Sequence, residues 1–115
     1  MSKKEKLLIV WSSSDREVAL KLPLLYGSVI LPREYWKEAH LMVWGPSIKL
    51  VAEDSEIQAQ VKKVLATGVQ ASTCIVCSDD YGVTDVLEEM GIEPIHTGEL
   101  LTEALKSDEW SVMTI

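Results

Sequence analysis

The sequence predicts an α/β fold, a three-layer sandwich in which helices cover both faces of a mostly parallel five-stranded sheet, with a flavodoxin-like appearance. Two observations predict this fold. Short apolar runs alternate with segments of helical periodicity along the whole chain, as in successive βα units. The apolar runs are continuous, which is typical of strands buried on both faces of a parallel sheet. Because the chain has 115 residues and shows no repeat or linker, we expect one domain, residues 1–115.

The strands are expected at five apolar runs that end in polar or glycine-rich segments. These runs are Lys6–Trp11, Leu41–Trp44, Val69–Val76, Ile92–His96 and Ser111–Ile115. The fourth run contains Pro94, which has no N–H group to donate to a neighbouring strand. Proline is therefore confined to edge strands and strand ends, and we expect this run at such a position.

The first helix is expected over residues 15–30, where apolar side chains recur at steps of three and four residues. Ser14 precedes three charged residues and is the expected N-cap of this helix. Pro23 lies inside the segment, and a proline in a helix interior costs about 3 kcal/mol and normally kinks the helix. We therefore expect a bend or a break near Leu22.

The segment between the second and third strands is also expected to be helical. The turn Trp44–Ser47 leads into it, with Ser47 as a candidate cap. Ser55 and Gln58 have the spacing of a capping box, and Gly68 is placed to end the helix. Two shorter helices are expected further on, over residues 83–90 and Gly98–Ser107.

The composition limits the classes of partner. A formal net charge of −7 argues against nucleic acid, because that binding depends on Lys and Arg neutralising phosphates, and it also disfavours an anionic membrane surface. The N-terminal apolar run is too short for a signal-peptide core or a membrane span, and no other segment approaches about 18 apolar residues. We therefore expect a cytoplasmic protein with no nucleic-acid partner and no membrane partner.

The two cysteines of the chain, Cys74 and Cys77, lie at the expected end of the third strand. In open α/β sheets the functional groups lie beyond the carboxyl ends of the strands, where the loops lead into helices. A helix starting near Ser78 or Asp79 would direct free N–H groups toward these thiols and favour the reactive thiolate. The sequence therefore makes the two cysteines candidate catalytic residues.

The charged residues nearby do not help to activate a thiol. Asp79 and Asp80 are expected in the first turn of that helix, where they suit the helix dipole but repel a thiolate. No Lys, Arg or His lies between Lys63 and His96. A base or a cationic partner must therefore come through the fold or from another subunit.

Other roles for the cysteine pair remain open. Cys74 also fits a small buried apolar residue at the end of a strand. A zinc site usually needs four ligands, and only the scattered His40 and His96 are available besides the cysteines, so we expect no metal and no cofactor. A thioredoxin-type dithiol would begin a helix, whereas this cysteine pair is expected where a strand runs into a loop; reversible disulfide formation remains an alternative.

Three segments resemble the DsrE/DsrF-like family of small α/β proteins, which includes sulfur-relay subunits. Residues 44–69, WGPSIKLVAEDSEIQAQVKKVLATGV, are similar to the family's second strand, loop and helix. Residues 74–93, CIVCSDDYGVTDVLEEMGIE, resemble the segment where many small members have Cys-x-x-Cys followed by Tyr-Gly-Val. Residues 100–115, LLTEALKSDEWSVMTI, are similar to the usual C-terminal Leu-Thr-Glu, Lys and final strand.

The resemblance implies a DsrE-like fold and a sulfane-sulfur carrier that uses a cysteine persulfide. In sulfur-relay members the persulfide-bearing cysteine precedes a helix glycine by eight residues, as Cys74 precedes Gly82 here. Cys77 resembles the second cysteine of a branch of small members and would resolve the persulfide. Relatives also imply a homo-oligomer, a trimer or hexamer, with protein donors and acceptors of sulfur.

Two other functions are kept as alternatives: a dithiol redox sensor, and an oligomer that binds a small ligand without turnover. The sequence does not separate a sulfurtransferase-like enzyme from a stoichiometric carrier. The candidate pocket around the cysteines draws on all three loops after the first three strands. Its expected residues are Ser12, Ser13, Gly45, Ser47, Asp79, Tyr81 and Gly82.

Overall fold

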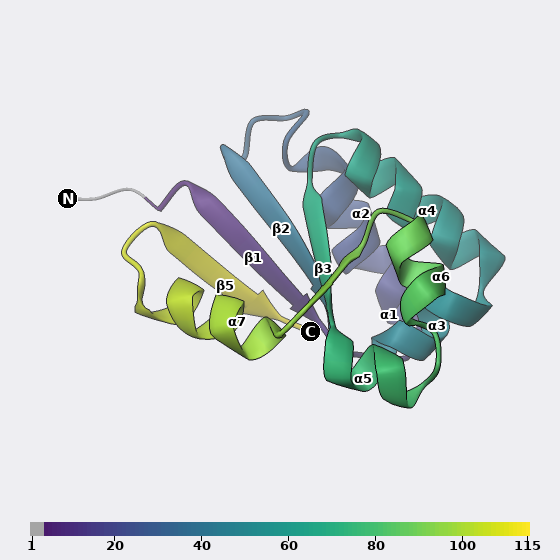
Figure 1. Cartoon of the computed structure of the whole chain (residues 1–115). Helices are drawn as coiled ribbons and strands as arrows, with labels where there is room; N and C mark the ends of the chain where they lie inside the picture. Colours follow the sequence, from purple (N-terminus) through teal and green to yellow (C-terminus); the bar gives the residue numbers. More distant parts are fainter. Residues whose placement is uncertain (1–3) are drawn as a thin grey trace.

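One five-stranded sheet forms the centre of the molecule. The computed structural model describes residues 4–115, so the first three residues of the expected domain lie outside the described part of the chain. The sheet order is β4-β3-β2-β1-β5, and every neighbouring pair is parallel (Figure 1). The strands are β1 (Lys6–Trp11), β2 (Glu38–Val43), β3 (Gln70–Cys74), β4 (Glu93–Ile95) and β5 (Trp110–Thr114). The predicted parallel sheet is confirmed, and the strand that contains Pro94 lies at its edge.

Seven helices connect these strands within residues 4–115. They are α1 (Arg16–Lys21), α2 (Pro23–Val29), α3 (Ser47–Glu53), α4 (Ser55–Ala66), α5 (Ile75–Asp80), α6 (Thr84–Glu89) and α7 (Thr97–Lys106). None of the helices in this part of the chain is long and apolar enough to cross a membrane.

The strand order explains why helices cover both faces. From β1 to β4 each strand lies next to its predecessor in the same direction, and right-handed crossovers then place α1–α6 on one face. The step from β4 to β5 runs back to the other edge of the sheet, which places α7 on the opposite face. In Figure 1, α7 lies beside β5 and apart from the other helices.

Each face of the sheet has its own apolar core. Leu7, Ile9 and Trp11 of β1 pack in the core formed with α1–α4 and α6. Their alternating neighbours Leu8 and Val10 pack on the other face, in a smaller core shared with α7. Burying an aliphatic side chain of this size fully contributes about 1.5–3 kcal/mol. Because both faces of β1 are buried, every residue along the strand from Leu7 to Trp11 is apolar.

The predicted break in the first helix is confirmed. Leu22 separates α1 from α2 with a non-helical backbone (φ −123°, ψ −79°), and Pro23 begins α2 in the first helical position, where its missing N–H group is not needed. The N-cap of α1 is Asp15, whose Oδ1 accepts the Val18 N–H at 3.0 Å, so the expectation of Ser14 is wrong by one residue.

The expected capping box at the start of α4 is also wrong. Asp54 caps this helix, and its Oδ1 accepts the N–H groups of Glu56 and Ile57, each at 3.0 Å. The Gln58 amide reaches back to the last carbonyls of α3 instead. The reason is that α3 ends at Glu53, so the linking residue is the extended Asp54 and Ser55 already belongs to the helix.

Candidate functional site

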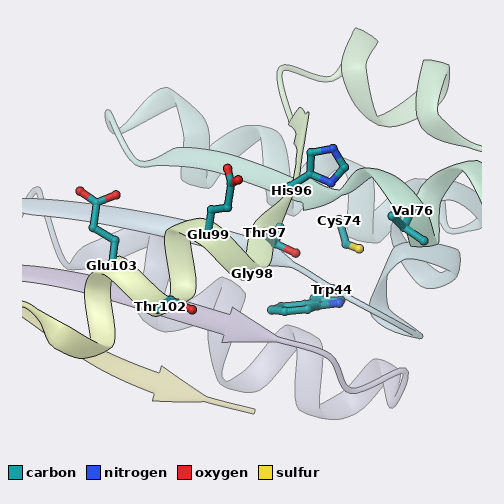
Figure 2. Close-up of a pocket in the computed structure, with 9 residues that line it drawn as sticks. All are labelled: Trp44, Cys74, Val76, His96, Thr97, Gly98, Glu99, Thr102 and Glu103. Carbon is teal, nitrogen blue, oxygen red and sulfur yellow. The ribbon is translucent and has the colours of Figure 1, made fainter.

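The chain topology creates a crevice between the carboxyl ends of β3 and β4. The chain leaves β3 toward α5, on one face of the sheet, whereas it leaves the neighbouring β4 toward α7, on the other face. Ligands of open α/β sheets bind where adjacent connections diverge in this way. An open cleft of about 1030 Å³ lies at this position. Its lining residues, drawn in Figure 2, are Trp44, Cys74, Val76, His96, Thr97, Gly98, Glu99, Thr102 and Glu103.

Cys74 ends β3 and is also the N-cap of α5. Its backbone is extended (φ −68°, ψ 112°), and its sulfur accepts a hydrogen bond from the Cys77 N–H at 3.4 Å. The expected strand end at Val76 and the expected helix start near Ser78 are therefore wrong. Ile75 and Val76 have the β-branched side chains typical of a strand, but the Cys74 sulfur caps the helix before them.

The earlier helix start changes the charges around the thiol. Asp79 and Asp80 lie in the last turn of α5 rather than in its first turn. Cys74 therefore faces the N–H groups at the start of α5, which stabilise a thiolate, rather than the two carboxylates that were expected to repel it. Cys-x-x-Cys occupies the cap and first turn of a helix, which is the arrangement that lowers thiol pKa values in dithiol proteins.

The pKa of Cys74 lies below the ordinary value of a thiol. Desolvation by burial is the largest single influence on this pKa and raises it, because the side chain is 8% exposed. Groups that can donate to a sulfur anion together outweigh it and lower the pKa: the Cys77 N–H, the Cys77 and Thr97 side chains and the Val76 N–H. Each of them favours the thiolate, so Cys74 is the cysteine that ionises more readily.

The pKa of Cys77 is shifted in the opposite direction. Burial is the largest influence and raises the pKa of Cys77. The neighbouring Cys74 sulfur raises this pKa further, by hydrogen bonding and by charge. The Gly45 N–H and the Trp44 side chain only partly oppose this rise. Both cysteines are free thiols, so Cys77 is the thiol that keeps its proton when Cys74 ionises.

The first turn of α7 forms the wall of the cleft beside Cys74. Its first residue, Thr97, is 1% exposed, and its hydroxyl has no hydrogen-bond partner among residues 4–115. The N-cap residue His96 makes no side-chain hydrogen bond to this turn. A Cβ atom built at Gly98 would meet nothing within 4 Å, so the start of the helix is open to the cleft.

The remaining walls are apolar on one side and acidic on the other. Trp44 and Val76 supply the apolar surface, and Val76 is 58% exposed. Glu99 and Glu103 lie one helical turn apart on α7. No Lys or Arg is among the described lining residues. The cleft therefore combines a poised thiol with an acidic entrance.

The serines of the first loop are not among the residues that line this cleft, and they have structural partners. The Ser12 N–H and hydroxyl donate to the Ile115 carbonyl at 2.8 and 3.0 Å, which fastens the C-terminus. Ser13 Oγ accepts the Asp15 N–H at 3.2 Å. Ser47 is buried and does not cap α3; its hydroxyl donates to the Trp11 carbonyl at 2.6 Å.

The other expected pocket residues lie around the far end of α5. Asp79 accepts a hydrogen bond from the Thr84 hydroxyl at 2.5 Å, Tyr81 lies under the Lys49 ammonium at 5.7 Å, and Gly82 has a positive φ of 70°. The Gly45 N–H group lies near the Cys77 thiol and lowers its pKa. Of the expected site residues, only Cys74 lines the cleft.

The residues that sequence reasoning missed belong to the connection after β4. His96, Thr97 and Gly98 begin α7 at the same edge as Cys74, whereas the sequence predicts a pocket built only from the loops after the first three strands. The signal was present in the expected strand Ile92–His96, whose carboxyl end also leads into a helix. Within residues 4–115 no group of three or more His, Cys, Asp and Glu residues is arranged to hold a metal ion.

His40 lies elsewhere, on the face of the sheet that α7 covers. Its Nε2 atom is 2.8 Å from the Ser72 hydroxyl, and burial lowers its pKa. This pair is separate from the lining of the cleft.

Fold and site together define the class: an α/β protein with a parallel sheet of order 4-3-2-1-5 and a helix-capping dithiol in the crevice between β3 and β4. No protein-family model matches the sequence, and no curated protein is significantly similar to it.

Solved structures share the fold. A conserved protein of unknown function, BT1422 from Bacteroides thetaiotaomicron, is 29% identical, with a TM-score of 0.91 over 96% of this chain and 95% of that one. The ychN protein from E. coli is 20% identical, with a TM-score of 0.73 over 96% and 99% of the two chains. MTH1491 from Methanobacterium thermoautotrophicum, also of unknown function, is 17% identical, with a TM-score of 0.69 over 96% and 98%. These likenesses establish the fold.

Proposed function

We propose that this protein is a DsrE/DsrF-like sulfur carrier that holds sulfane sulfur as a persulfide on Cys74. The observation that carries the proposal is the position of Cys74 as the cap of α5 in the crevice between β3 and β4. A thiol there has the electrostatic support of a helix start and access to an open cleft. The resemblance of residues 74–93 to the family and the shared fold support the same function.

The transfer is a thiol–disulfide exchange. The Cys74 thiolate attacks the outer sulfur of a donor persulfide, R–S–SH. A new S–S bond forms on Cys74 while the donor's own S–S bond breaks. The donor leaves as R–S⁻ with the electron pair, and Cys74 becomes Cys74–S–SH. An acceptor thiolate then attacks the outer sulfur in the same way and regenerates the Cys74 thiolate.

Cys77 provides a second reaction by which the persulfide on Cys74 can be consumed. A Cys77 thiolate attacks the inner sulfur on Cys74, releases HS⁻, and leaves a Cys74–Cys77 disulfide. The Cα atoms of a cap residue and a residue three positions on lie within the range of roughly 4.4–6.8 Å that a disulfide requires. An external dithiol must then reduce the disulfide before another cycle. Because the pKa of Cys77 is raised, little Cys77 thiolate is present, and this reaction is slow while Cys74 carries the persulfide.

A dithiol redox switch is the second candidate function. The structure favours it through one specific observation, because Cys-x-x-Cys occupies a helix cap and first turn rather than the loop expected from the sequence. In that function the two thiols are oxidised to a disulfide and reduced again, and both cysteines are equally required. For either function, a trimeric or hexameric homo-oligomer stays a prediction of the family resemblance, and a cytoplasmic location stays a prediction of the sequence.

Intact-protein mass spectrometry after incubation with a sulfane-sulfur donor tests the proposal. The parent, Cys74→Ser and Cys77→Ser are compared under the same conditions. We expect a gain of one sulfur atom in the parent and in Cys77→Ser, and no gain in Cys74→Ser. Persulfide should accumulate to a higher level in Cys77→Ser because the resolving thiol is absent.

The other outcomes assign the alternatives. Loss of two hydrogen atoms in the parent, abolished equally by either substitution, would make the protein a dithiol switch. No mass change in any variant would contradict sulfur transfer and favour an oligomer that binds a small ligand in the cleft.

A further inference from the structure

The Thr97 hydroxyl is the unexplained polar group of the cleft. It is the buried side-chain oxygen without a hydrogen-bond partner among residues 4–115, in a residue that is 1% exposed. Burying a hydroxyl without a partner is unfavourable, and native structures rarely retain such a group without a purpose. Packing alone does not require it, because valine has nearly the same shape.

The hydroxyl lies on the side of the cleft where the Cys74 sulfur is found (Figure 2). It makes no hydrogen bond to the neutral thiol, yet it favours the ionised form of Cys74. A thiol sulfur is a weak acceptor, whereas a sulfur anion is a strong one. The partner that Thr97 lacks is therefore a negatively charged sulfur.

The start of α7 offers the same kind of partner from its backbone. This helix has ten residues, and its first N–H groups have no carbonyl four residues earlier in the helix to donate to, although the Glu99 N–H donates to the His96 carbonyl at 3.1 Å. The N-cap side chain of His96 does not occupy them, and Gly98 leaves the approach open. The positive end of the helix dipole also favours an anion at this position.

We propose that Thr97 and the first turn of α7 bind the outer sulfur of a Cys74 persulfide anion. This inference rests on the proposed function. An S–S bond of about 2.05 Å carries the negative charge one atom beyond the Cys74 sulfur, into the cleft that Thr97 and Gly98 line. Thr97 is a positioning residue: it holds the outer sulfur as Cys74–S–S⁻ and protects it from thiolates, which attack the protonated form more readily.

Two substitutions distinguish the effect of the Thr97 hydroxyl from the effect of the side-chain shape. Thr97→Val keeps the shape and removes the hydroxyl, whereas Thr97→Ser keeps the hydroxyl. Each protein is loaded with sulfur, freed of donor and mixed with a fixed concentration of a small thiol. Mass spectrometry follows the loss of the added sulfur, and near-ultraviolet absorbance against pH follows ionisation of the persulfide. We expect Thr97→Val to lose sulfur roughly tenfold faster and to ionise at higher pH, because a hydrogen bond to a charged group is lost. Thr97→Ser should behave as the parent.

Thr73→Val is the matched control, since Thr73 is equally buried but its hydroxyl already donates to the Val43 carbonyl at 2.9 Å. This change should destabilise the fold and leave the rate of sulfur loss unchanged. Thr97→Val should unfold at the same or a higher denaturant concentration than the parent, because it removes an unpaired hydroxyl. Thr97→Ala repeats the test if the valine variant does not fold.

The outcomes distinguish the two proposals. If the parent acquires sulfur and Thr97→Val retains it as long and ionises at the same pH, only the role of Thr97 is overturned. If the parent acquires no sulfur, sulfur transfer and the persulfide site are both overturned. Equal acceleration in Thr97→Val and Thr73→Val would assign the effect to packing and also overturn the role of Thr97.

Discussion

Cys74 and Cys77 are one helical turn apart, yet their pKa values are shifted in opposite directions. The difference arises because the sulfur of the cap residue accepts N–H groups at the start of α5, including the Cys77 N–H at 3.4 Å. Cys77 lies inside the same turn, where it faces the sulfur of Cys74 rather than the free N–H groups. Position relative to the helix start therefore decides which thiol ionises more readily.

This difference predicts the order of alkylation. Because the thiolate is the reactive form, the reactivity of Cys74 should persist at lower pH than that of an ordinary thiol and be lost only as pH falls through its lowered pKa. Near neutral pH we expect iodoacetamide to modify Cys74 roughly tenfold faster than Cys77. Peptide mapping of the singly alkylated protein against pH measures both rates. Faster modification of Cys77 would contradict the assignment of the nucleophile.

Residue type determines how much of the site could be predicted from the sequence. Cys74 was found because thiols are rare and chemically distinctive. Thr97 was missed because threonine is common at helix starts, and only the burial of its hydroxyl without a partner marks it. The serines of the first loop are predicted in the pocket because of their hydroxyl groups, but the Ser12 hydroxyl donates to the Ile115 carbonyl and Ser13 Oγ accepts the Asp15 N–H in the turn before α1.

At the scale of elements, α2 and α4 approach each other closely at Gly27. A Cβ atom at this position would lie 3.2 Å from Cγ1 of Val64, and Val64 is fully buried in the larger core. A contact of this length requires the neighbour to move, which a close-packed core resists. The absence of a side chain at Gly27 therefore allows the two helices to pack.

We predict that Gly27→Ala destabilises the protein by about 1 kcal/mol. The gain in helix propensity, up to about 1 kcal/mol, is outweighed by an overpacking cost of about 1–3 kcal/mol. In a Val64→Ala background the same substitution should become neutral or stabilising, because the clash is removed. Urea unfolding of the four proteins of this double-mutant cycle measures the coupling.

Gly98→Ala is the control for this cycle. Its Cβ atom would meet nothing within 4 Å, so the substitution should not destabilise the fold. A destabilisation by Gly27→Ala that persists without the Val64 side chain would show that the close approach of the helices is not its cause.

Elements were predictable where one local signal acts alone, and not where two compete. The break near Leu22 follows from Pro23, which has no compatible position inside a helix. The start of α5 was missed because β-branched Ile75 and Val76 resemble a strand, while the cap is made by a sulfur atom, an unusual N-cap acceptor. Two of the three caps expected at serines lie at neighbouring aspartates, because either side chain can accept N–H groups and the backbone decides between them.

At the scale of the whole molecule, the parallel sheet followed from continuous apolar runs, but the strand order did not. That order depends on whether the last connection returns across the sheet, which no local pattern encodes. The strand order determines where the candidate site lies, because it places α7 on the face opposite α5 and creates the crevice between β3 and β4. The first turn of α7 therefore meets Cys74 only in the folded protein.

The charge of the molecule also bears on which donors reach this crevice. The formal net charge is −7, and the described lining contains Glu99 and Glu103 but no Lys or Arg. Two like unit charges about 8 Å apart in water repel by about 0.5 kcal/mol. A dianion near two carboxylates therefore meets on the order of 1–2 kcal/mol of repulsion before salt screening.

We predict that the protein takes sulfur poorly from thiosulfate and more readily from the persulfide of a cationic thiol such as cysteamine. In the thiosulfate reaction the Cys74 thiolate forms Cys74–S–S⁻ and sulfite leaves with the electron pair, so two anions must meet in the acidic entrance. Glu99→Gln combined with Glu103→Gln should accelerate this reaction roughly tenfold at low ionic strength and slow transfer from the cationic donor. The rate of sulfur gain by mass spectrometry, with each donor and each protein, measures both effects.

The control is Glu88→Gln combined with Glu89→Gln, which changes the net charge equally at exposed positions of α6 outside the lining of the cleft. If local charge selects the donor, this control should change the rates much less than the cleft variant does. In about 1 M salt, where the Debye length is about 3 Å, the difference between cleft variant and parent should largely disappear. Equal effects of the two double variants would mean that the total charge of the molecule acts on the donor, and a salt-independent effect would mean that the two carboxylates act through shape rather than charge.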